Sequence, residues 1–266
     1  MIGISHVKTH TLLASVVAVM VAGSFWQPVN PHAVDFTATL EGPSVRHWLG
    51  TDQLGRDLAS RILAGATPSL LAICIVLISS LGIGLLAGVA IGFAPKPVSA
   101  TIRWLAETAL ALPTLIVALL LSALFGAGLI AISAALVAST WAPYAITIAG
   151  LLERLRGEAY WTASMALGSN TIGAIRRHGL PNAWPMIGAL AGADAGRAVI
   201  LVASLGFLGL SADTGQPEWG AMINEYRLFL FSEPRLVLAP VLATTLVAFT
   251  LNRALDRGEQ RNPRAN

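Results

Sequence analysis

The sequence predicts an all-α integral membrane protein with six spans, and three observations lead to this prediction. Of the 266 residues, 55% are hydrophobic and 12% are charged, and the mean hydropathy is +0.69. Soluble domains carry about 25% charged residues, so this composition excludes a soluble globular protein. Long charge-free runs also have the length that a helix needs to cross a bilayer, and the basic residues are unequally shared between the two sides that these runs would create.

The first charge-free run covers residues 11–34, with its densest apolar part at residues 12–26. We expect a membrane span here, since about 20 apolar residues suffice to cross the hydrocarbon core. A cleaved signal peptide is the alternative, because Lys8 precedes the run and small residues lie near Val21 and Gly23.

The polar stretch 30–68 follows and is expected to be a loop, because it is rich in Pro, Gly, Asp and Arg. Residues 69–94 form the second expected span. Within it Gly84, Gly88 and Gly92 stand four apart on one helix face, a spacing that lets a neighbouring helix approach closely.

A loop is expected next around Lys96 and Arg103, and then 45 residues, 108–152, carry no charge. This run is too long for one span, and the glycines at 126 and 128 divide it into expected spans at 108–125 and 129–150. Pro113 and Pro143 are expected to kink these spans, which membranes tolerate where neighbours satisfy the freed carbonyl groups.

The segment from Glu158 to Pro181 is the most polar and basic interior part of the chain. Its apolar residues recur at roughly helical spacing, and Gly168 to Asn170 interrupt the pattern. We therefore expect two short helices with a bend, lying at the membrane surface because the charges could not cross the bilayer cheaply. Pro181 and Pro185 are expected to start a new apolar run.

The last two expected spans are residues 186–210 and 236–252. The fifth span holds Asp194 and Arg197, three apart on one helix face, as an ion pair could be. Two interpretations remain open: the two charges neutralise each other, or they belong to a translocation pathway. Residues 253–266 form a basic tail.

The positive-inside rule orients these six spans with both termini in the cytoplasm. That topology gives eleven basic residues on the cytoplasmic side and five on the outer side, with Arg197 in a span, out of 17 in all. The cytoplasmic set is Lys8, Lys96, Arg103, Arg154, Arg156, Arg176, Arg177, Arg253, Arg257, Arg261 and Arg264, and the outer set is Arg46, Arg56, Arg61, Arg227 and Arg235. The sequence pI near 9.5 therefore indicates membrane orientation and not nucleic-acid binding.

Several kinds of site are not expected in this chain. Cys74 is the one cysteine, which excludes an internal disulfide, and the five histidines show no spacing typical of a metal site. Neither lysine follows a glycine-rich phosphate-binding loop. We thus expect no catalytic site, no metal and no cofactor bound by the chain itself.

Three motifs carry a resemblance to a known family. Residues 47–61 read HWLGTDQLGRDLASR and residues 217–222 read PEWGAM. The 158–181 segment has the glycine, the Leu-Pro and the spacings of a "Glu-Ala-Ala" loop, with Thr162, Ser164 and His178 departing from its usual residues. Together they resemble permease subunits of binding-protein-dependent ABC importers, in the dipeptide, oligopeptide and nickel branch.

The resemblance implies a six-helix type I importer subunit in the bacterial inner membrane, forming half of a translocation pathway for di- or oligopeptides. It would work with a second permease, an extracytoplasmic solute-binding protein and two cytoplasmic ATPases, which would bind ATP and Mg. The implied parts are residues 1–68, a core domain at 69–252 with an ATPase-coupling loop at 153–185, and the tail. The loop's coupling residues would be Ala163, Ser164, Gly168, Leu180 and Pro181.

This function has alternatives. Within the branch, nickel, nickel chelates (metallophores) and opines are alternative substrates. An ion-coupled secondary transporter would need buried carboxylates along a path, and Asp194 is the one that lies well inside an expected span. A structural or assembly subunit without transport is a third alternative, against which the three motifs argue.

Overall fold

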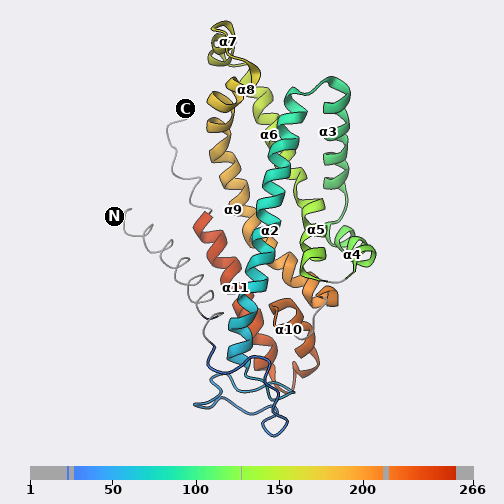
Figure 1. Cartoon of the computed structure of the whole chain (residues 1–266), viewed down its shortest axis with the longest axis vertical. Helices are drawn as coiled ribbons and strands as arrows, with labels where there is room; N and C mark the ends of the chain where they lie inside the picture. The colour runs from blue at the N-terminus through green and yellow to red at the C-terminus, as the bar shows by residue number, and fades with distance from the viewer. Residues whose placement is uncertain (1–22, 24–26, 127, 212–215, 256–266) are drawn as a thin grey trace, which may run out of the picture.

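The longest helix, α2 (Leu58–Phe93), runs through the bundle and joins its two ends (Figure 1). The computed structural model describes residues 23, 27–126, 128–211 and 216–255. In this part of the chain there are helices and one isolated bridge, between Thr51 and Asp57, but no strand. The other elements are α3 (Lys96–Ala111), α4 (Thr114–Phe125), α5 (Leu129–Thr140), α6 (Ala142–Arg156), α7 (Ala159–Ala166), α8 (Thr171–Ala174), η1 (Ile175–Gly179), α9 (Leu180–Leu205), η2 (Gly206–Leu210), α10 (Trp219–Tyr226), η3 (Arg227–Phe229) and α11 (Pro234–Leu255).

Close packing of α2 against α6 follows from the glycines predicted to lie on one face. A Cβ atom at Gly84 would stand 2.4 Å from Tyr144 Cβ, and one at Gly88 would stand 2.8 Å from the Ala145 carbonyl oxygen. Only glycine permits this approach of the two backbones. At Gly92 a Cβ atom would be 3.7 Å from Leu152, so the two helices pack less tightly there.

The start of α2 corrects the sequence prediction, which placed residues 58–68 in a loop. Asp57 caps the helix by accepting a hydrogen bond from the Ser60 amide at 2.8 Å. Ser60 and Arg61 suggested a loop because they are polar, yet both are buried. Each has a polar partner far away in the sequence, since Ser60 Oγ accepts from the Val29 amide and Arg61 Nη2 donates to Glu225, and a local pattern cannot show such contacts.

The third expected span, 108–125, is also wrong in its boundaries. The structure has two helices, α3 and α4, bent by 101° at a break before Thr114. Leu112 is extended, with φ −86° and ψ 134°, because the residue before a proline disfavours the helical conformation. Pro113 therefore breaks the span where a kink was expected, and the loop expected around Lys96 and Arg103 is helical.

The fifth expected span likewise begins earlier than predicted. Helix continues from Thr171 through η1 and α9 into η2, where Gly209 has a left-handed backbone with φ 85°. Pro181 does not restart the chain, because the π-helical turn η1 leads directly into α9 and Pro181 is accommodated in that continuous helix. Pro185 is accommodated inside the same helix.

Four helices of the described part are long and apolar enough to cross a membrane, or five if the bent α3–α4 pair counts as one span. They are Leu58–Phe93, Leu129–Arg156, Thr171–Leu210 and Pro234–Arg253. The expected first span, 11–34, lies largely outside the described residues. The protein is an all-α, multi-pass membrane protein.

Candidate functional site

The α7–α8 loop, residues 157–179, stands at one end of the bundle (Figure 1). Gly168 separates α7 from α8 and has a φ of 91°, a left-handed conformation that side chains other than glycine adopt at a cost. Asn170 then caps α8, its side chain accepting a hydrogen bond from the Gly173 amide at 2.7 Å. The bend predicted at residues 168–170 is confirmed.

The structure brings together three of the five loop residues identified from the sequence. Ala163 and Gly168 are exposed, and Ser164 Oγ donates to Ser169 Oγ at 3.0 Å across the turn. Leu180 and Pro181 lie apart from this turn, in the first residues of α9. They form the junction between the loop and the bundle.

Large apolar side chains at the loop turn are left uncovered. Leu167 is 88% exposed, Ile172 is 76% exposed and Met165 is 40% exposed. Exposed apolar groups clustered on a segment that contains both a charged stretch and a fixed turn mark a contact site for another molecule. In the sequence these residues belong to the same apolar pattern as Trp161 and Ile175, and helical periodicity alone does not separate the exposed residues from those facing the bundle.

One side chain fastens α7 to the bundle. Trp161 is the buried residue of α7, at 5% exposure, and its ring stacks on Phe93 with 5.7 Å between ring centroids and 23° between planes. Arg156 lies over the same Phe93 ring at 4.9 Å and donates from Nη1 to the Gly92 carbonyl at 2.8 Å. The loop thus meets the last residues of α2 through aromatic contacts.

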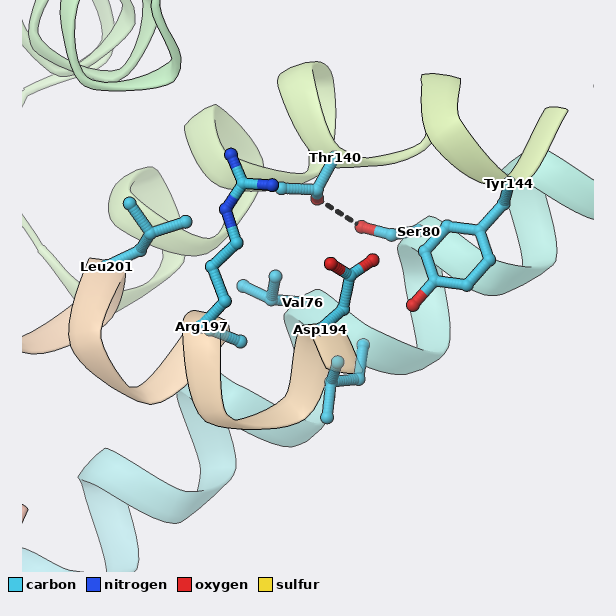
Figure 2. Close-up of a pocket in the computed structure, with 9 residues that line it drawn as sticks. Val76, Ser80, Thr140, Tyr144, Asp194, Arg197 and Leu201 are labelled. Carbon is cyan, nitrogen blue, oxygen red and sulfur yellow. Dashed lines mark hydrogen bonds between the residues drawn. The ribbon is translucent and has the colours of Figure 1, made fainter. Parts of the chain in front are cut away.

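A second polar group of residues lies within the bundle, between α2, the α5–α6 pair and α9 (Figure 2). Its cavity of about 10 Å³ is lined by Ser80, Thr140, Tyr144, Asp194 and Arg197 among others, and this is room for about one water molecule. Ser80 and Thr140 share a hydrogen bond of 2.5 Å. The buried Tyr144 hydroxyl and the Asp194 carboxylate interact across this cavity, and Figure 2 shows the two groups facing each other.

Asp194 and Arg197 both border this cavity, but the ion pairs of the described residues do not include one between them. Figure 2 shows the Arg197 side chain extending toward Thr140, away from the Asp194 carboxylate. Asp194 is half-buried and Arg197 is exposed. The two residues therefore share a cavity without forming the close pair that their spacing suggested.

The opposite end of the bundle is closed by a cap, which we define as residues 27–57, the first turn of α2 (residues 58–61) and residues 216–226, which include α10 (Figure 1). Its centre is a buried ion network that joins the start of α2 to α10. Arg56 Nε donates to Asp52 Oδ2 at 2.7 Å, Arg61 Nη2 donates to Glu225 Oε2 at 2.8 Å, and Arg56 also pairs with Glu225. Tyr226 completes it by donating its hydroxyl to Asp52 at 3.0 Å.

Burial and neighbouring charges both shift pKa values in this network. Burial lowers the pKa of Arg56, but the hydrogen bond to Glu225 and the charge of Asp52 outweigh burial and raise it. Burial raises the pKa of the Tyr226 hydroxyl, which keeps it a neutral donor to Asp52. The four charges balance in pairs, which is the condition under which buried ions are tolerated.

Two of the sequence motifs meet in this cap. Asp52, Arg56, Asp57 and Arg61 belong to the 47–61 motif, and the 217–222 motif supplies Glu218, which caps α10 by accepting from the Gly220 and Ala221 amides, each at 2.9 Å. The sequence reasoning named the motifs without assigning them a role. It missed Glu225 and Tyr226, and the buried charges of the first motif were the signal that acidic and hydroxyl partners had to exist elsewhere.

A further arginine ties the cap to α11. Arg235, in the first turn of α11, donates to the backbone carbonyls of Leu40 at 2.9 Å and Leu49 at 3.1 Å. Among the described residues, no group of three or more His, Cys, Asp and Glu side chains is placed to hold a metal ion.

Comparison with known proteins finds one family whose sequence profile matches residues 80–261, described as the binding-protein-dependent transport system inner membrane component. The chain is 30% identical to the nickel transport system permease protein NikC of Escherichia coli (strain K12), over 92% of this chain and 88% of that protein. It is 32% identical to the glutathione transport system permease protein GsiD of Pectobacterium atrosepticum, over 89% and 80%. It is 33% identical to the dipeptide transport system permease protein DppC of Alkalihalophilus pseudofirmus, over 93% and 80%.

Proposed function

The chain belongs to the family of binding-protein-dependent transport system inner membrane components, and we propose that it forms half of the translocation pathway of an ATP-driven importer for di- or oligopeptides. Members of this family are transport components and not enzymes. In the proposed importer the other half of the pathway is a second permease. Two cytoplasmic ATPase subunits supply ATP hydrolysis, and a solute-binding protein delivers the substrate from outside.

The observation that carries this proposal is the uncovered apolar turn of the α7–α8 loop. Leu167 and Ile172 are 88% and 76% exposed on either side of Gly168, whose left-handed backbone fixes the turn. Burying an apolar side chain of this size is worth about 1.5–3 kcal/mol, so a complementary groove would gain binding energy here. Ala163 and Ser164 present small side chains beside the turn, which would let an ATPase subunit approach the helix backbone.

The orientation of the protein follows from its charges. The positive-inside rule puts the α7–α8 loop and both termini in the cytoplasm, and the cap then lies outside. Arg176 and Arg177 are exposed within the loop segment, and neither could remain in the hydrocarbon core without cost. This orientation supports the loop as the ATPase contact and the cap as the side that a binding protein meets.

The cavity between α2, the α5–α6 pair and α9 supports a role for Asp194 and Arg197 in the pathway. Arg197 is exposed on a helix that is long enough to span the membrane. A charged side chain at such depth faces a bundle interior or water, so in the assembled importer this face of α9 would meet the second permease or the pathway. Asp194→Asn should then impair uptake while the amount of folded protein stays normal, and a parallel loss of folded protein would assign the pair a structural role.

Peptides are the substrate class that the relatives favour. Two of those described above are a glutathione and a dipeptide permease, and another relative is a probable D,D-dipeptide permease of Escherichia coli, 31% identical. The nickel permease is similarly related, so nickel or a nickel chelate is the alternative. The test is calorimetric titration of the cognate binding protein with dialanine and with Ni²⁺, and tight binding of Ni²⁺ alone would overturn the peptide assignment.

The ATPase contact is tested at Gly168. Gly168→Val forces a β-branched side chain into the left-handed region and should distort the turn, whereas Gly168→Asn tolerates that conformation. A Cβ atom at this position meets nothing within 4 Å, so neither variant creates a clash. Gly168→Val should insert normally into membranes and lose co-purification of the ATPase subunit, and Gly168→Asn should keep it. Equal co-purification from wild type and Gly168→Val would exclude this loop as the contact.

A further inference from the structure

The two halves of the α7–α8 loop are attached to the bundle in different ways. Its second half continues as unbroken helix from Thr171 into α9, so any movement of the turn is passed to α9 through the backbone. Its first half, α7, has no such continuity with α2. The contact with α2 is made by side chains, and Trp161 is the residue of α7 that is buried.

The Trp161 contact falls on the end of α2. Phe93 is the last residue of α2, and its ring takes the stacked Trp161 ring at 5.7 Å and the Arg156 guanidinium at 4.9 Å. Arg156 also binds the Gly92 carbonyl at 2.8 Å, where the helix end carries partial negative charge. Around them Leu155, Ala174 and Ile175 form a buried cluster with Trp161. The end of α2 is thereby held by two elements, by α6 through Arg156 and by the loop through Trp161.

The other end of α2 is held as firmly in the cap. Its 36 residues form one helix, about 54 Å long at a rise of 1.5 Å per residue. Near its start Arg61 binds Glu225 at 2.8 Å, and the Ile62 carbonyl accepts from Trp219 Nε1 at 3.0 Å, both on α10. A rigid element with defined contacts at both ends can carry displacement from one to the other.

We infer that Trp161 is a positioning residue that holds α7 against the end of α2, so that movement of the α7–α8 loop reaches α2 directly, and through α2 the α10 side of the cap. This inference rests on the proposed function, in which an ATPase subunit moves the loop. With the Trp161–Phe93 contact intact, α2 and the loop move as one body. Without it, α9 still follows the loop through the backbone, but α2 is linked to the loop mainly through its packing against α6.

The test compares Trp161→Ala with Trp161→Phe and with a matched aromatic control, Tyr160→Ala. Tyr160 is the neighbouring residue of α7, and its ring meets His178 within the same loop, with 5.6 Å between centroids. Removing it deletes an aromatic contact of the loop without touching α2. Trp161→Phe keeps an apolar ring for Phe93 to stack on.

The measurement is the distance between spin labels on α2 and α7 in the complete transporter. Labels are placed at Leu86, which is 73% exposed, and at Ala159, an exposed residue of α7 outside the apolar turn, after replacing the exposed Cys74 by serine. Distances are recorded without nucleotide and with ATP and vanadate. Co-purification of the ATPase subunit is measured for each labelled protein as the control for assembly.

In wild type, Trp161→Phe and Tyr160→Ala, we expect one narrow distance that nucleotide does not change. In Trp161→Ala we expect a distribution about twofold broader whose centre shifts with ATP and vanadate, because α7 is then no longer held against the end of α2 when the loop moves. A narrow, nucleotide-independent distance in Trp161→Ala would overturn the inference. If wild type fails to co-purify the ATPase subunit, the proposed function itself fails, and the inference falls with it.

Discussion

The cap and the α7–α8 loop occupy opposite ends of one helix, and they are built on opposite principles. In the cap, Asp52 and Arg61 are at most 1% exposed and their charges are paired within the chain. In the loop, Leu167 is 88% exposed and Trp161 is the buried residue of α7. The cap pairs its buried charges with one another, whereas the loop has large apolar side chains that no described residue covers.

This difference teaches where the stability of the chain resides and where its contacts with other subunits are to be expected. Buried ion networks rigidify a structure when every charge is matched. An element held by few buried contacts opens locally at low cost. We therefore expect substitutions in the cap to affect folding and substitutions at the loop turn to affect assembly, with α2 connecting the two regions.

The largest effect is expected from Asp52→Asn in the cap. Asp52 accepts hydrogen bonds from the Arg56 side chain and from the Tyr226 hydroxyl, so the variant leaves Arg56 and Arg61 to share the single countercharge of Glu225 within this network. Breaking a buried pair in this way costs about 3–5 kcal/mol. The thermal unfolding midpoint in detergent should fall strongly, and the yield of folded protein should fall with it.

A matched control for this prediction lies between α3 and α6. Arg103 pairs there with Glu153, and the two side chains are 37% and 48% exposed. Exposed ion pairs contribute about 0–1 kcal/mol, so Glu153→Gln should change the unfolding midpoint little. If both variants lose the same stability, the buried network of the cap is not what distinguishes the two ends.

The next effect is expected in the middle of α2, at Gly84. A Cβ atom there would stand 2.4 Å from Tyr144 Cβ and 2.8 Å from the Trp141 carbonyl oxygen, so Gly84→Ala forces α2 and α6 apart. Overpacking of this kind costs about 1–3 kcal/mol. On the same helix, a Cβ atom at Gly82 meets nothing within 4 Å, and Gly82→Ala should lose no stability. Unfolding in detergent measures both, and equal midpoints would refute close packing at Gly84.

The sequence predicted the fold best where the signal is local. The glycine face of α2 and the bend at residues 168–170 are confirmed. Both depend on residues that lie close together in the sequence, so a local pattern can show them. It failed where a local signal conflicts with distant contacts. Ser60 and Arg61 suggested a loop, yet they lie in α2 because Glu225, 164 residues away from Arg61, supplies the missing charge. Pro113 was expected to kink a span and instead divides it into α3 and α4.

The candidate site could also be predicted from the sequence only in part, for the same reason. The loop residues Ala163, Ser164 and Gly168 could be identified from their spacing, although their role stays a prediction. Leu167 and Trp161 are both apolar residues of one short segment, and nothing in the sequence says that one is exposed and the other buried. Asp194 and Arg197 have the spacing of an ion pair, but the cavity beside them lets each side chain take its own direction (Figure 2).

A smaller effect is expected at Asp35, on the exposed edge of the cap, when the pH is lowered. The Asp35 carboxylate accepts hydrogen bonds from the Thr37 hydroxyl and amide, which lower its pKa from the ordinary 3.8. Because the folded-state pKa is lowered, the stabilisation is complete above pH 3.8 and is lost as the pH falls through the folded-state value. Amide exchange at Thr37, corrected for its intrinsic pH dependence, should be slower in wild type than in Asp35→Asn at pH 7 and should converge in acid. A difference that persists unchanged in acid would exclude Asp35 as its source.

The smallest effect on the stability of this chain is expected at the tip of the loop. Leu167→Ala removes a side chain that is 88% exposed, and surface substitutions of this kind change stability by about 0.5 kcal/mol or less. The same side chain, once buried in a partner, would contribute about 1.5 kcal/mol or more, which corresponds to about tenfold in affinity. Leu167→Ala should thus unfold like wild type but bind the ATPase subunit about tenfold more weakly. Ile130 on α5 is 81% exposed and far from the loop in the sequence, so Ile130→Ala should alter neither property. A side chain whose removal leaves folding unchanged and weakens assembly belongs to an interface, and equal ATPase affinity in Leu167→Ala and Ile130→Ala would remove Leu167 from it.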